Sequence, residues 1–535
     1  MTVAQEKQII ETDQYSINFQ DYDPISQAVH LRPRNKEHIT ERFNDTDPKK
    51  TWELSKNKRI KAILKDRRIQ FLLILPNQII FWMVIILGLV GTVVPGLNFG
   101  TAITWYLWFC VVFVMMVVVG RAWCAMCPFG GFAEWLQRKT FWQRTQKALG
   151  LGKKFPEPLA RWGFLLSVAT FLILTWIEEY FNIAGPGAPS ATAWMVVGIV
   201  TTAVAFFLIF ERRTFCRYLC PLTALIGSIG ATGSVAGFRT KDRNICLECK
   251  TKDCMRGGED GYGCPWYTWP GSADSNLSCG LCTECYKACP SDNIGLFLQR
   301  PLTSVIAPKR RRVDIAIAVL LLWGLVIFQQ FNATNVYSNI DNWLNAKMHF
   351  PQYPNPVDYI GIIGLVALIT GALILAAGFA FGKKDAATYK ASSSVMATPK
   401  KSLLSKRPKV LAYLLPISYG LIPVIGSDYF ARQLPKFFKH VLRLIPSIGA
   451  WFGAGSTHSS LYHTRILSDP SIVIAQIVVI ALGTLASLWA MNKIFNRDLK
   501  PLARNEIAMR LSVSLIVLAC GFVCGFLYYI MHAAS

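Results

Sequence analysis

Nine apolar stretches, each about 20 residues long, recur along the 535-residue chain with polar segments between them. A helix of about that length crosses the hydrocarbon core of a bilayer and keeps its backbone hydrogen bonds internal. Charged residues make up only 16% of the chain, against roughly 25% in soluble proteins. We therefore expect an all-α polytopic membrane protein with nine transmembrane helices, and a wholly soluble protein is excluded. The apolar stretches lie at about 71–94, 101–120, 161–183, 193–210, 313–331, 357–382, 409–427, 471–491 and 510–531.

The chain has a formal net charge of +24, which in a soluble protein would suggest binding to nucleic acid. Here the lysines and arginines flank the apolar stretches and concentrate in alternate loops, as the positive-inside rule expects of cytoplasmic loops. We therefore expect the lipid bilayer, and no nucleic acid, as a partner. The rule places the N-terminus and the long polar segment 211–312 in the cytoplasm, and nine crossings then place the C-terminus outside.

One loop departs from this charge pattern. Residues 428–470 should lie outside, yet they contain five basic residues. Between Phe430 and Phe452 basic and bulky apolar residues alternate at helical spacing, which favours a helix lying in the membrane interface. A tenth short span is the alternative. The basic residues are Arg432, Lys436, Lys439, Arg443 and Arg465.

The polar segments divide the chain into four parts. Residues 1–70 form a basic N-terminal arm, 71–210 a four-helix membrane unit, 211–312 a cytoplasmic segment, and 313–535 a C-terminal membrane domain of about five helices. The four-helix unit is an internal repeat, because each of its two hairpins is followed by an aromatic residue, two cysteines and a proline. These ends read Arg121-Ala-Trp-Cys-Ala-Met-Cys-Pro128 and Arg213-Thr-Phe-Cys-Arg-Tyr-Leu-Cys-Pro221.

The strongest chemical signal is the run Cys279, Cys282, Cys285 and Cys289, followed by Pro290. Its C-x2-C-x2-C-x3-C-P spacing is that of bacterial ferredoxins, in which three thiolates bind one [4Fe-4S] cluster and the fourth binds a second cluster. The main alternative is zinc, although zinc sites usually use two separated cysteine pairs. The run predicts a ferredoxin domain at about 240–300.

A second cysteine set precedes this run, with wider gaps. Cys246, Cys249, Cys254 and Cys264 have the spacing C-x2-C-x4-C-x9-C, and a proline again follows the last cysteine. Glycines in the longer gaps permit tight turns. We interpret the set as a degenerate second ferredoxin repeat. With crossed ligation, one [4Fe-4S] cluster would be bound by Cys246, Cys249, Cys254 and Cys289, and the other by Cys264, Cys279, Cys282 and Cys285.

The remaining cysteines are less specific. Two pairs, Cys124 with Cys127 and Cys216 with Cys220, end the two hairpin repeats, and their spacing of three or four residues places each pair on one helix face. Four such thiols could hold a third metal centre or act as redox dithiols, or they could simply pack the helix ends. Buried free cysteine behaves as a small hydrophobe, and we expect this of Cys110, Cys520 and Cys524.

Other polar residues near the predicted outer face give weaker signals. Glu178 and Glu179 end the third apolar stretch, and we favour solvated carboxylates over a proton or quinone site. Four histidines are expected to lie in loops or at the interface, with a haem or copper site as the alternative. These histidines are His349, His440, His458 and His463.

Taken together, several motifs resemble the membrane polyferredoxins, the group that includes the NapH, NosR and CcoG proteins. The resemblance is carried by Asn98–Trp108, Gly120–Gly130, Cys216–Pro221 and the ferredoxin runs, and covers about 71–312. It implies a bacterial inner-membrane protein with two cytoplasmic [4Fe-4S] clusters that moves electrons through or along the membrane. The N-terminal arm is too short for the outer flavin domain of NosR-type proteins. The five helices after 312 exceed the minimal four-helix version of the group, and the resemblance implies no function for them.

Three functions follow from these patterns, and no catalytic residue is predicted for any of them. The first is an electron-transfer protein that relays single electrons between a quinone pool or a cytoplasmic donor and a respiratory or assembly partner. The second is an assembly factor that reduces a metal ion or thiols during maturation of a respiratory metalloenzyme. The third is a redox-switched transporter or sensor, although the C-terminal helices hold few of the charges that a solute path usually requires.

Overall fold

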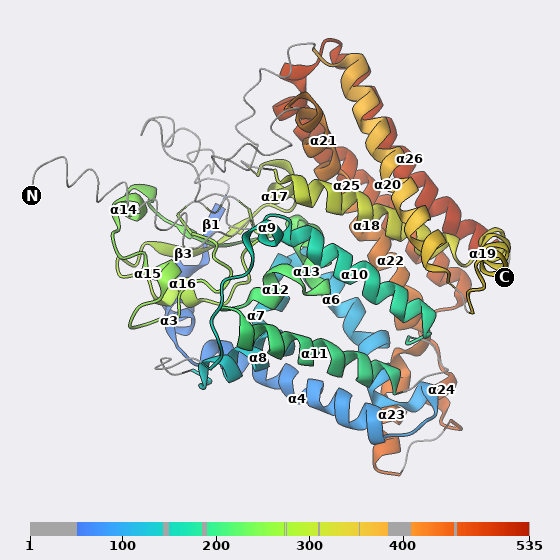
Figure 1. Cartoon of the computed structure of the whole chain (residues 1–535), viewed down its shortest axis with the longest axis horizontal. Helices are drawn as coiled ribbons and strands as arrows, with labels where there is room; N and C mark the ends of the chain where they lie inside the picture. The colour runs from blue at the N-terminus through green and yellow to red at the C-terminus, as the bar shows by residue number, and fades with distance from the viewer. Residues whose placement is uncertain are drawn as a thin grey trace, which may run out of the picture.

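The computed structural model of the chain describes residues 51–142, 149–184, 190–271, 273, 275–308, 311–351, 354–383, 408–453 and 457–533 (Figure 1). This part of the chain is mostly helical. It contains nine helices long and apolar enough to cross a membrane, in agreement with the nine predicted. They are Ile69–Val90, Phe99–Arg138, Gly163–Tyr180, Ala191–Ile209, Val313–Phe331, Pro356–Phe381, Val410–Trp451, Asp469–Leu502 and Glu506–Ile530.

The first membrane unit packs four of these helices together. Helix α11 lies against α4 and α8, and α10 lies against α13, which follows the second hairpin. The second spanning helix is not uniform, because its α5 segment passes into a π-helix, η4, before α6 begins. The bounds are α4 (Ile69–Val90), α5 (Phe99–Thr101), η4 (Ala102–Trp108), α6 (Phe109–Val119), α8 (Pro128–Arg138), α10 (Gly163–Tyr180), α11 (Ala191–Ile209) and α13 (Pro221–Ile229).

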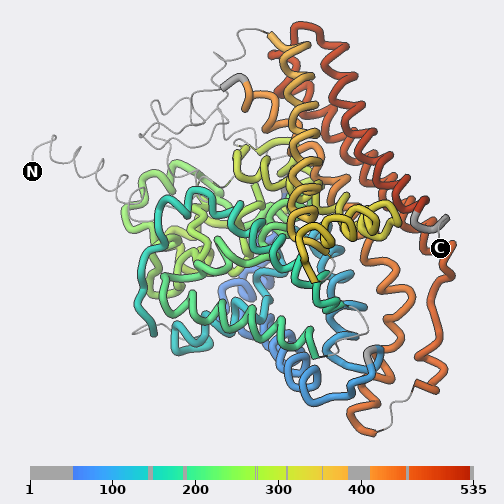
Figure 2. Tube along the Cα trace, turned by 45° about the vertical axis from the view of Figure 1, so that its right-hand side comes forward, coloured from blue at the N-terminus to red at the C-terminus, as the bar shows by residue number. Residues whose placement is uncertain are grey.

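The C-terminal membrane domain packs against this unit mainly through two helices. Helix α18 contacts α10, and α22 contacts α6 and η4. The apolar windows of the spans Val313–Phe331 and Val410–Trp451 are 78% buried, whereas those of the other seven are 28–39% buried. Helix α18 and the segment formed by α21 and α22 therefore lie at the centre of the assembly. Figure 2 shows α20 and α26 side by side at its edge. The bounds are α18 (Val313–Phe331), α20 (Pro356–Phe381), α21 (Pro408–Gly420), α22 (Ile422–His440), α25 (Asp469–Ile494) and α26 (Glu506–Ala533).

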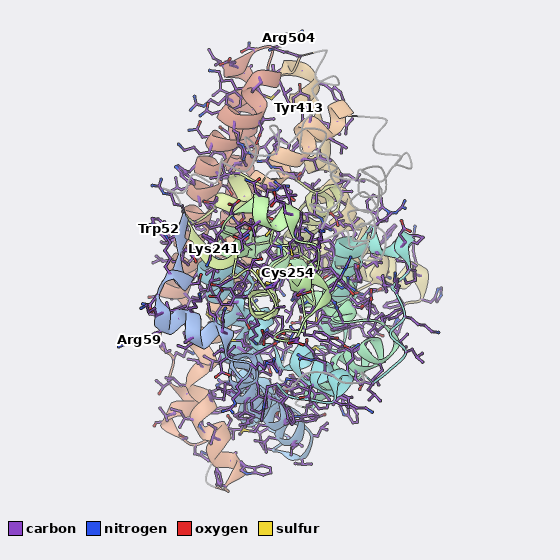
Figure 3. All side chains as sticks on the ribbon, turned by 90° about the vertical axis from the view of Figure 1, so that its left-hand side faces the viewer. Trp52, Arg59, Lys241, Cys254, Tyr413 and Arg504 are labelled. Atoms are coloured by element: carbon purple, nitrogen blue, oxygen red, sulfur yellow. The ribbon has the colours of Figure 1, made fainter. Side chains whose placement is uncertain are left out.

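The polar insertion between α11 and α18 is built on a small antiparallel sheet. Strands β2 (Val235–Thr240) and β3 (Ile294–Gln299) pair with each other, and the eight cysteines of the ferredoxin pattern lie on the chain between them. Between these two strands lie three short helices, α14 (Arg243–Glu248), α15 (Asp253–Arg256) and α16 (Glu284–Lys287). Figure 3 looks onto this face of the molecule, with Cys254 near its centre.

The second half of the N-terminal arm belongs to the same sheet. Strand β1 (Thr51–Glu53) pairs with β3, so that the strand order is β1-β3-β2. Helix α3 (Lys58–Lys65) follows, and both Lys61 and Lys65 pair with Asp292, the latter at 2.9 Å. The basic residues before the first span therefore dock the arm onto the insertion, a role that their position beside an apolar stretch did not indicate. Residues 1–50 of the predicted arm lie outside the described residues.

One region departed from the expected charge pattern. Most of it, residues 428–451, belongs to the seventh apolar helix. The residues expected to lie along the interface continue α22 through η9 (Val441–Arg443) into α23 (Leu444–Trp451), and no tenth span is found in the described part of the chain. The stretch is helical, as expected, but it continues the seventh apolar helix and does not form a separate segment. Its basic residues meet acidic partners instead: Arg432 lies 2.7 Å from Glu179 and Lys436 lies 3.9 Å from Glu178.

Candidate iron-sulfur sites

The ferredoxin run forms a tight loop that ends in helix α16. Leu281 and Thr283, the residues between its first three cysteines, have φ of 52° and 67°. Such left-handed backbone reverses the chain within a few residues. Two of the three thiols, those of Cys282 and Cys285, are buried. The loop thus keeps closely spaced cysteines on the inside of the turn, as cluster binding requires.

One predicted ligand set surrounds a single cavity. Cys246, Cys249, Cys254 and Cys289 all line the same small cavity. Burial raises the pKa of the Cys254 thiol, and the neighbouring Cys246, Cys289, Cys264 and Cys249 raise it further. The structure therefore brings together four cysteines that are up to 43 positions apart in the sequence (289 − 246).

The other predicted set gathers beside it. Burial raises the pKa of the Cys285 thiol, with further contributions from Cys264, Cys282 and Cys279. Burial also raises the pKa of the Cys264 thiol, to about 11. Four cysteines in low-dielectric surroundings disfavour four separate thiolate charges. A metal cluster removes that cost because its iron takes up the thiolate charge.

The two cysteine sets share a local hydrogen-bonding pattern. The backbone N–H of Thr268 donates to Sγ of Cys264 at 3.3 Å, and that of Asn293 donates to Sγ of Cys289 at 3.4 Å. In each case the donor lies four residues after a cysteine that precedes a proline. This equivalence supports the interpretation of the wider-spaced set as a second ferredoxin repeat. Donors to sulfur are also among the groups that tune cluster potentials.

Strand β2 approaches the second set too closely for a side chain. Gly237 has φ of 94° and lies at a register shift between β2 and β3. A Cβ atom at this position would lie 2.9 Å from Sγ of Cys279. Glycine is therefore required here for both its backbone conformation and the space that it leaves to the thiol.

Buried cations lie close to both cysteine sets. Lys252, 7% exposed, lines the cavity of the first set, and its ammonium donates to the carbonyl of Cys246. Arg121, 1% exposed, donates to the carbonyl of Leu277 and lies over the ring of Trp266, 4.3 Å from its centroid. Nε and Nη2 of Arg121 have no hydrogen-bond partner. Isolated buried cations are costly, whereas a cube with four thiolate ligands is an anion that would balance them.

The helix-end cysteines lie at breaks between helices and not along one helix face. Cys127 and Cys220 are the N-cap residues of α8 and α13, and a proline follows each of them at the first helical position. Their partners lie in the preceding helices, Cys124 in α7 (Trp123–Met126) and Cys216 in α12 (Thr214–Tyr218). The predicted placement on a common face is wrong, because each helix ends before the second cysteine and the proline after that cysteine starts a new helix.

These breaks still bring the two pairs together. Burial raises the pKa of the Cys216 thiol well above its usual value, and the charges of Cys220, Cys127 and Cys124 raise it further. Helix N-termini add donors to sulfur, since the backbone N–H groups of Leu222 and Thr223 hydrogen-bond to Cys220. Cys124, Cys127, Cys216 and Cys220 thus form one group, which we term the helix-end quartet.

Arg213 connects the quartet to the ferredoxin insertion. Its guanidinium, 1% exposed, pairs with Glu134 at 2.5 Å and donates to the carbonyl of Cys124 at 3.0 Å. It acts electrostatically on both Cys216 and Cys282, so it lies within range of both cysteine groups. Arg121 and Arg213 occupy equivalent positions before the two cysteine pairs, and this shared arginine in the repeat was the sequence signal for their role.

The spacing of the thiols does not suit a single metal ion. Within the described residues, no group of three or more His, Cys, Asp or Glu side chains is placed to hold one. A four-iron cube binds each thiolate through a different iron, so its ligands lie farther apart than those of zinc. The donor set and its spacing therefore fit a cube better than the zinc alternative.

The other sequence candidates have different surroundings. Cys110, Cys520 and Cys524 are buried within helices, as expected of small apolar residues. The predicted solvated carboxylates, Glu178 and Glu179, are about one-fifth exposed and ion-paired, so that expectation is wrong. The four histidines are not gathered into a metal site within the described residues.

Comparison with known proteins identifies one domain. The family model described as a 4Fe-4S binding domain matches residues 101–150 and 192–233. These residues contain the helix-end quartet and the two hairpin ends but not the eight cysteines between Cys246 and Cys289. The match supports an iron-sulfur, ferredoxin-like protein and does not distinguish the NapH, NosR and CcoG groups. No match was found among the curated proteins or the solved structures.

Proposed function

We propose that the protein is a membrane-bound iron-sulfur protein that transfers single electrons between a donor and a partner in or on the membrane. The observation that carries this proposal is the pair of four-cysteine groups with equivalent N–H to sulfur bonds. They lie next to a membrane unit that matches a 4Fe-4S binding domain. Clusters of this kind supply one-electron transfer and need no acid or base, in keeping with the absence of any predicted catalytic residue.

Each cluster would have its own ligand set. Cys246, Cys249, Cys254 and Cys289 would hold one [4Fe-4S] cluster around their shared cavity. The second would be held by Cys264, Cys279, Cys282 and Cys285. Lys252 and Arg121 contribute positive charge from buried positions, which favours the more negative, reduced state of a neighbouring cluster and raises its potential.

The helix-end quartet would hold a third metal centre. Cys220 accepts hydrogen bonds from backbone donors, as Cys264 and Cys289 of the ferredoxin sets do, and both matched stretches of the 4Fe-4S family model contain one of the quartet's pairs. Redox dithiols are the other use of these thiols. Arg213 lies within electrostatic range of Cys216 and Cys282, so a centre in the quartet would be the neighbour of the second cluster on an electron-transfer path.

We place the protein in a bacterial inner membrane, with the insertion in the cytoplasm and the C-terminus outside. The nine apolar helices and the basic residues at alternate helix ends support this arrangement. A reporter fused after Ser535 should be active on the outer face, and one inserted within 383–408 should be active in the cytoplasm. The opposite result at both positions would reverse the topology.

A second candidate function is the reduction of a metal ion or of thiols during assembly of a respiratory enzyme. The observation that favours it is the placement of Cys220, which lines a large cavity between the membrane helices. A small substrate in that cavity would have direct access to a quartet thiol. Quinol-driven reduction of the clusters supports the electron-transfer function, whereas turnover of copper or thiols without quinol supports the assembly function.

Iron and acid-labile sulfide analysis of anaerobically purified protein tests the proposal. Two [4Fe-4S] clusters require about eight iron atoms per chain and a third raises the number to about twelve. Electron paramagnetic resonance of the dithionite-reduced protein should show the signals of reduced cubes. A colourless protein without sulfide would refute the electron-transfer function.

A further inference from the structure

A cavity between the membrane helices has a volume of about 280 Å³ and is partly open to its surroundings. It is close to the lower end of the range of small-molecule sites, roughly 300–1,000 Å³. The space runs along α10: its inner end is lined by Cys220, whose carbonyl accepts a hydrogen bond from Ser167, and its far end by Glu178. Eleven residues of helix between Ser167 and Glu178 correspond to about 16 Å, so the cavity is elongated.

The far end of the cavity is polar, and the C-terminal domain supplies most of it. Arg432, Gln433 and Lys436 of α22 line it together with Glu178 of α10. Arg432 and Lys436 are engaged by the two glutamates. Gln433 is different: its side chain is 8% exposed, and its Oε1 has no hydrogen-bond partner. A buried acceptor without a donor carries a free-energy cost, and a donating ligand in the cavity would remove it.

The walls of the cavity are aromatic. The π-helix η4 contributes Trp105 and Trp108, and Trp123 lies farther along. Trp105 stacks on Phe109 with ring centroids 4.9 Å apart, and the ammonium of Lys436 lies 4.7 Å from the centroid of Trp105. Segments of π-helix are rare and are frequent at functional sites. The walls suit a flat, conjugated ring whose polar substituents point to the α22 end.

The cavity also reaches the outside of the helix bundle. Ile80 and Val111 line it and are 40% and 42% exposed, on surfaces that belong to spanning helices. A molecule dissolved in the bilayer can therefore enter from the side. In Figure 1, α22 passes next to α6, so the C-terminal domain closes the side of the cavity that the first membrane unit leaves open.

We infer that this cavity is a binding site for a lipid-soluble quinone, with the ring held between η4 and α22 and its oxygens at Gln433 and Lys436. The choice of a quinone over another lipid rests on the proposed function, because a quinone is a lipid-soluble electron carrier. The inference gives the C-terminal membrane domain a role: α22 provides the polar groups that orient the ring. In the hydroquinone form, a ring hydroxyl is the donor that Oε1 of Gln433 lacks.

Binding is measured by quenching of tryptophan fluorescence, using the full-length protein in detergent and a decyl-substituted benzoquinone as the probe. Three of the sixteen tryptophans line the cavity, so the quenching should saturate at a minor fraction of the total emission. Gln433→Leu should raise the Kd of the reduced probe about threefold to tenfold, the loss of one hydrogen bond. Val84→Phe, which fills part of the cavity, should abolish the saturable component.

The matched control is Gln476→Leu. Gln476 is a buried glutamine of α25 whose Oε1 also lacks a partner, but it does not line the cavity. Its substitution should leave the Kd unchanged. Melting temperatures of all three variants identify any that fail to fold, and the conservative Gln433→Asn replaces the first variant in that case.

The outcomes separate this inference from the proposed function. Non-saturable quenching, or equal Kd values for the wild type and a folded Val84→Phe variant, overturns the quinone site even if the protein contains its full iron. Displacement of the probe by phospholipid at equal concentration assigns the cavity to acyl chains and also overturns it. If the protein contains no iron but still binds the probe, the quinone site is supported and the proposed electron-transfer function is refuted.

Discussion

The guanidinium of Arg432 on α22 lies 2.7 Å from the carboxylate of Glu179 at the end of α10. This pair joins the C-terminal membrane domain to the four-helix unit, two parts of the chain that are 253 residues apart. Both side chains are about one-fifth exposed. A charge in such a position is costly without its partner, so the contact favours this arrangement of the two parts.

Removal of one member of this pair should destabilise the protein. Arg432→Gln leaves Glu179 without its cation, and we expect a loss of about 1–3 kcal/mol, less than for a fully buried pair because water still reaches both groups. Thermal melting in detergent measures the change. In a double-mutant cycle, adding Glu179→Gln should restore part of the loss. Strictly additive effects would show that the pair contributes nothing.

Cys282→Ser should remove one cluster. The iron content should fall from about eight atoms to about four per chain if the quartet is metal-free. The segment 240–300 should become sensitive to protease, because metal binding supplies much of the folding free energy of small metal domains. The control is Cys520→Ser, which replaces a buried cysteine of α26 and should retain the wild-type iron content. An unchanged spectrum for Cys282→Ser would show that Cys282 is not a cluster ligand.

Gly237→Ala should disrupt the second cluster although it replaces none of the ligand cysteines. The added methyl group would lie 2.9 Å from Sγ of Cys279 and would require a backbone conformation that alanine rarely adopts. We expect loss of one set of cluster signals in electron paramagnetic resonance. Gly198→Ala, at a helix position with nothing within 4 Å of the added atom, is the matched control. Normal spectra from both variants would contradict the close approach.

The helix-end quartet is tested by substituting one cysteine from each pair. If the quartet holds a third centre, the double variant Cys124→Ser/Cys220→Ser should lose about four of about twelve iron atoms. The signals of the ferredoxin clusters should remain. An unchanged iron content together with altered thiol titration would assign the quartet to redox dithiols.

Attachment of the N-terminal arm to the insertion should depend on pH only at acidic pH. Slight burial acts to raise the pKa of Asp292, but hydrogen bonds and charges from Lys61 and Lys65 outweigh it and lower the pKa to about 2. The unfolded value is about 3.9, so the contribution is complete above about pH 5 and is lost as the pH falls towards 2. Digestion with trypsin at pH 7 should cut Asp292→Asn within residues 56–65 faster than wild type.

The matched control for this prediction is Glu259→Gln, at an exposed acid of the same insertion. It should be cut at the wild-type rate. High salt should accelerate cutting of the wild type, because the Lys65 to Asp292 contact is partly exposed and is therefore screened. Equal rates for Asp292→Asn and wild type would show that pairing of β1 with β3 holds the arm without the charges.

Sequence periodicity was sufficient to predict the helices but not the residues that pair between helices. The fifth apolar stretch, predicted at 313–331, has those bounds in the structure, because length and hydropathy alone decide whether a segment can span. The basic residues of α22 were misinterpreted, since their partners Glu178 and Glu179 lie on a helix far away in the sequence. A charge pattern along the chain cannot show which acids face which bases.

The same division applies to the sites. The spacing from Cys279 to Cys289 predicted ferredoxin chemistry, because ligand spacing within one loop is a local property. The folded chain alone determined that Cys289 joins Cys246 around one cavity and that Gly237 makes room for Cys279. It also placed Gln433 of α22 in the cavity of the first membrane unit. These relationships depend on packing between segments that are well separated in the sequence, which no local pattern encodes.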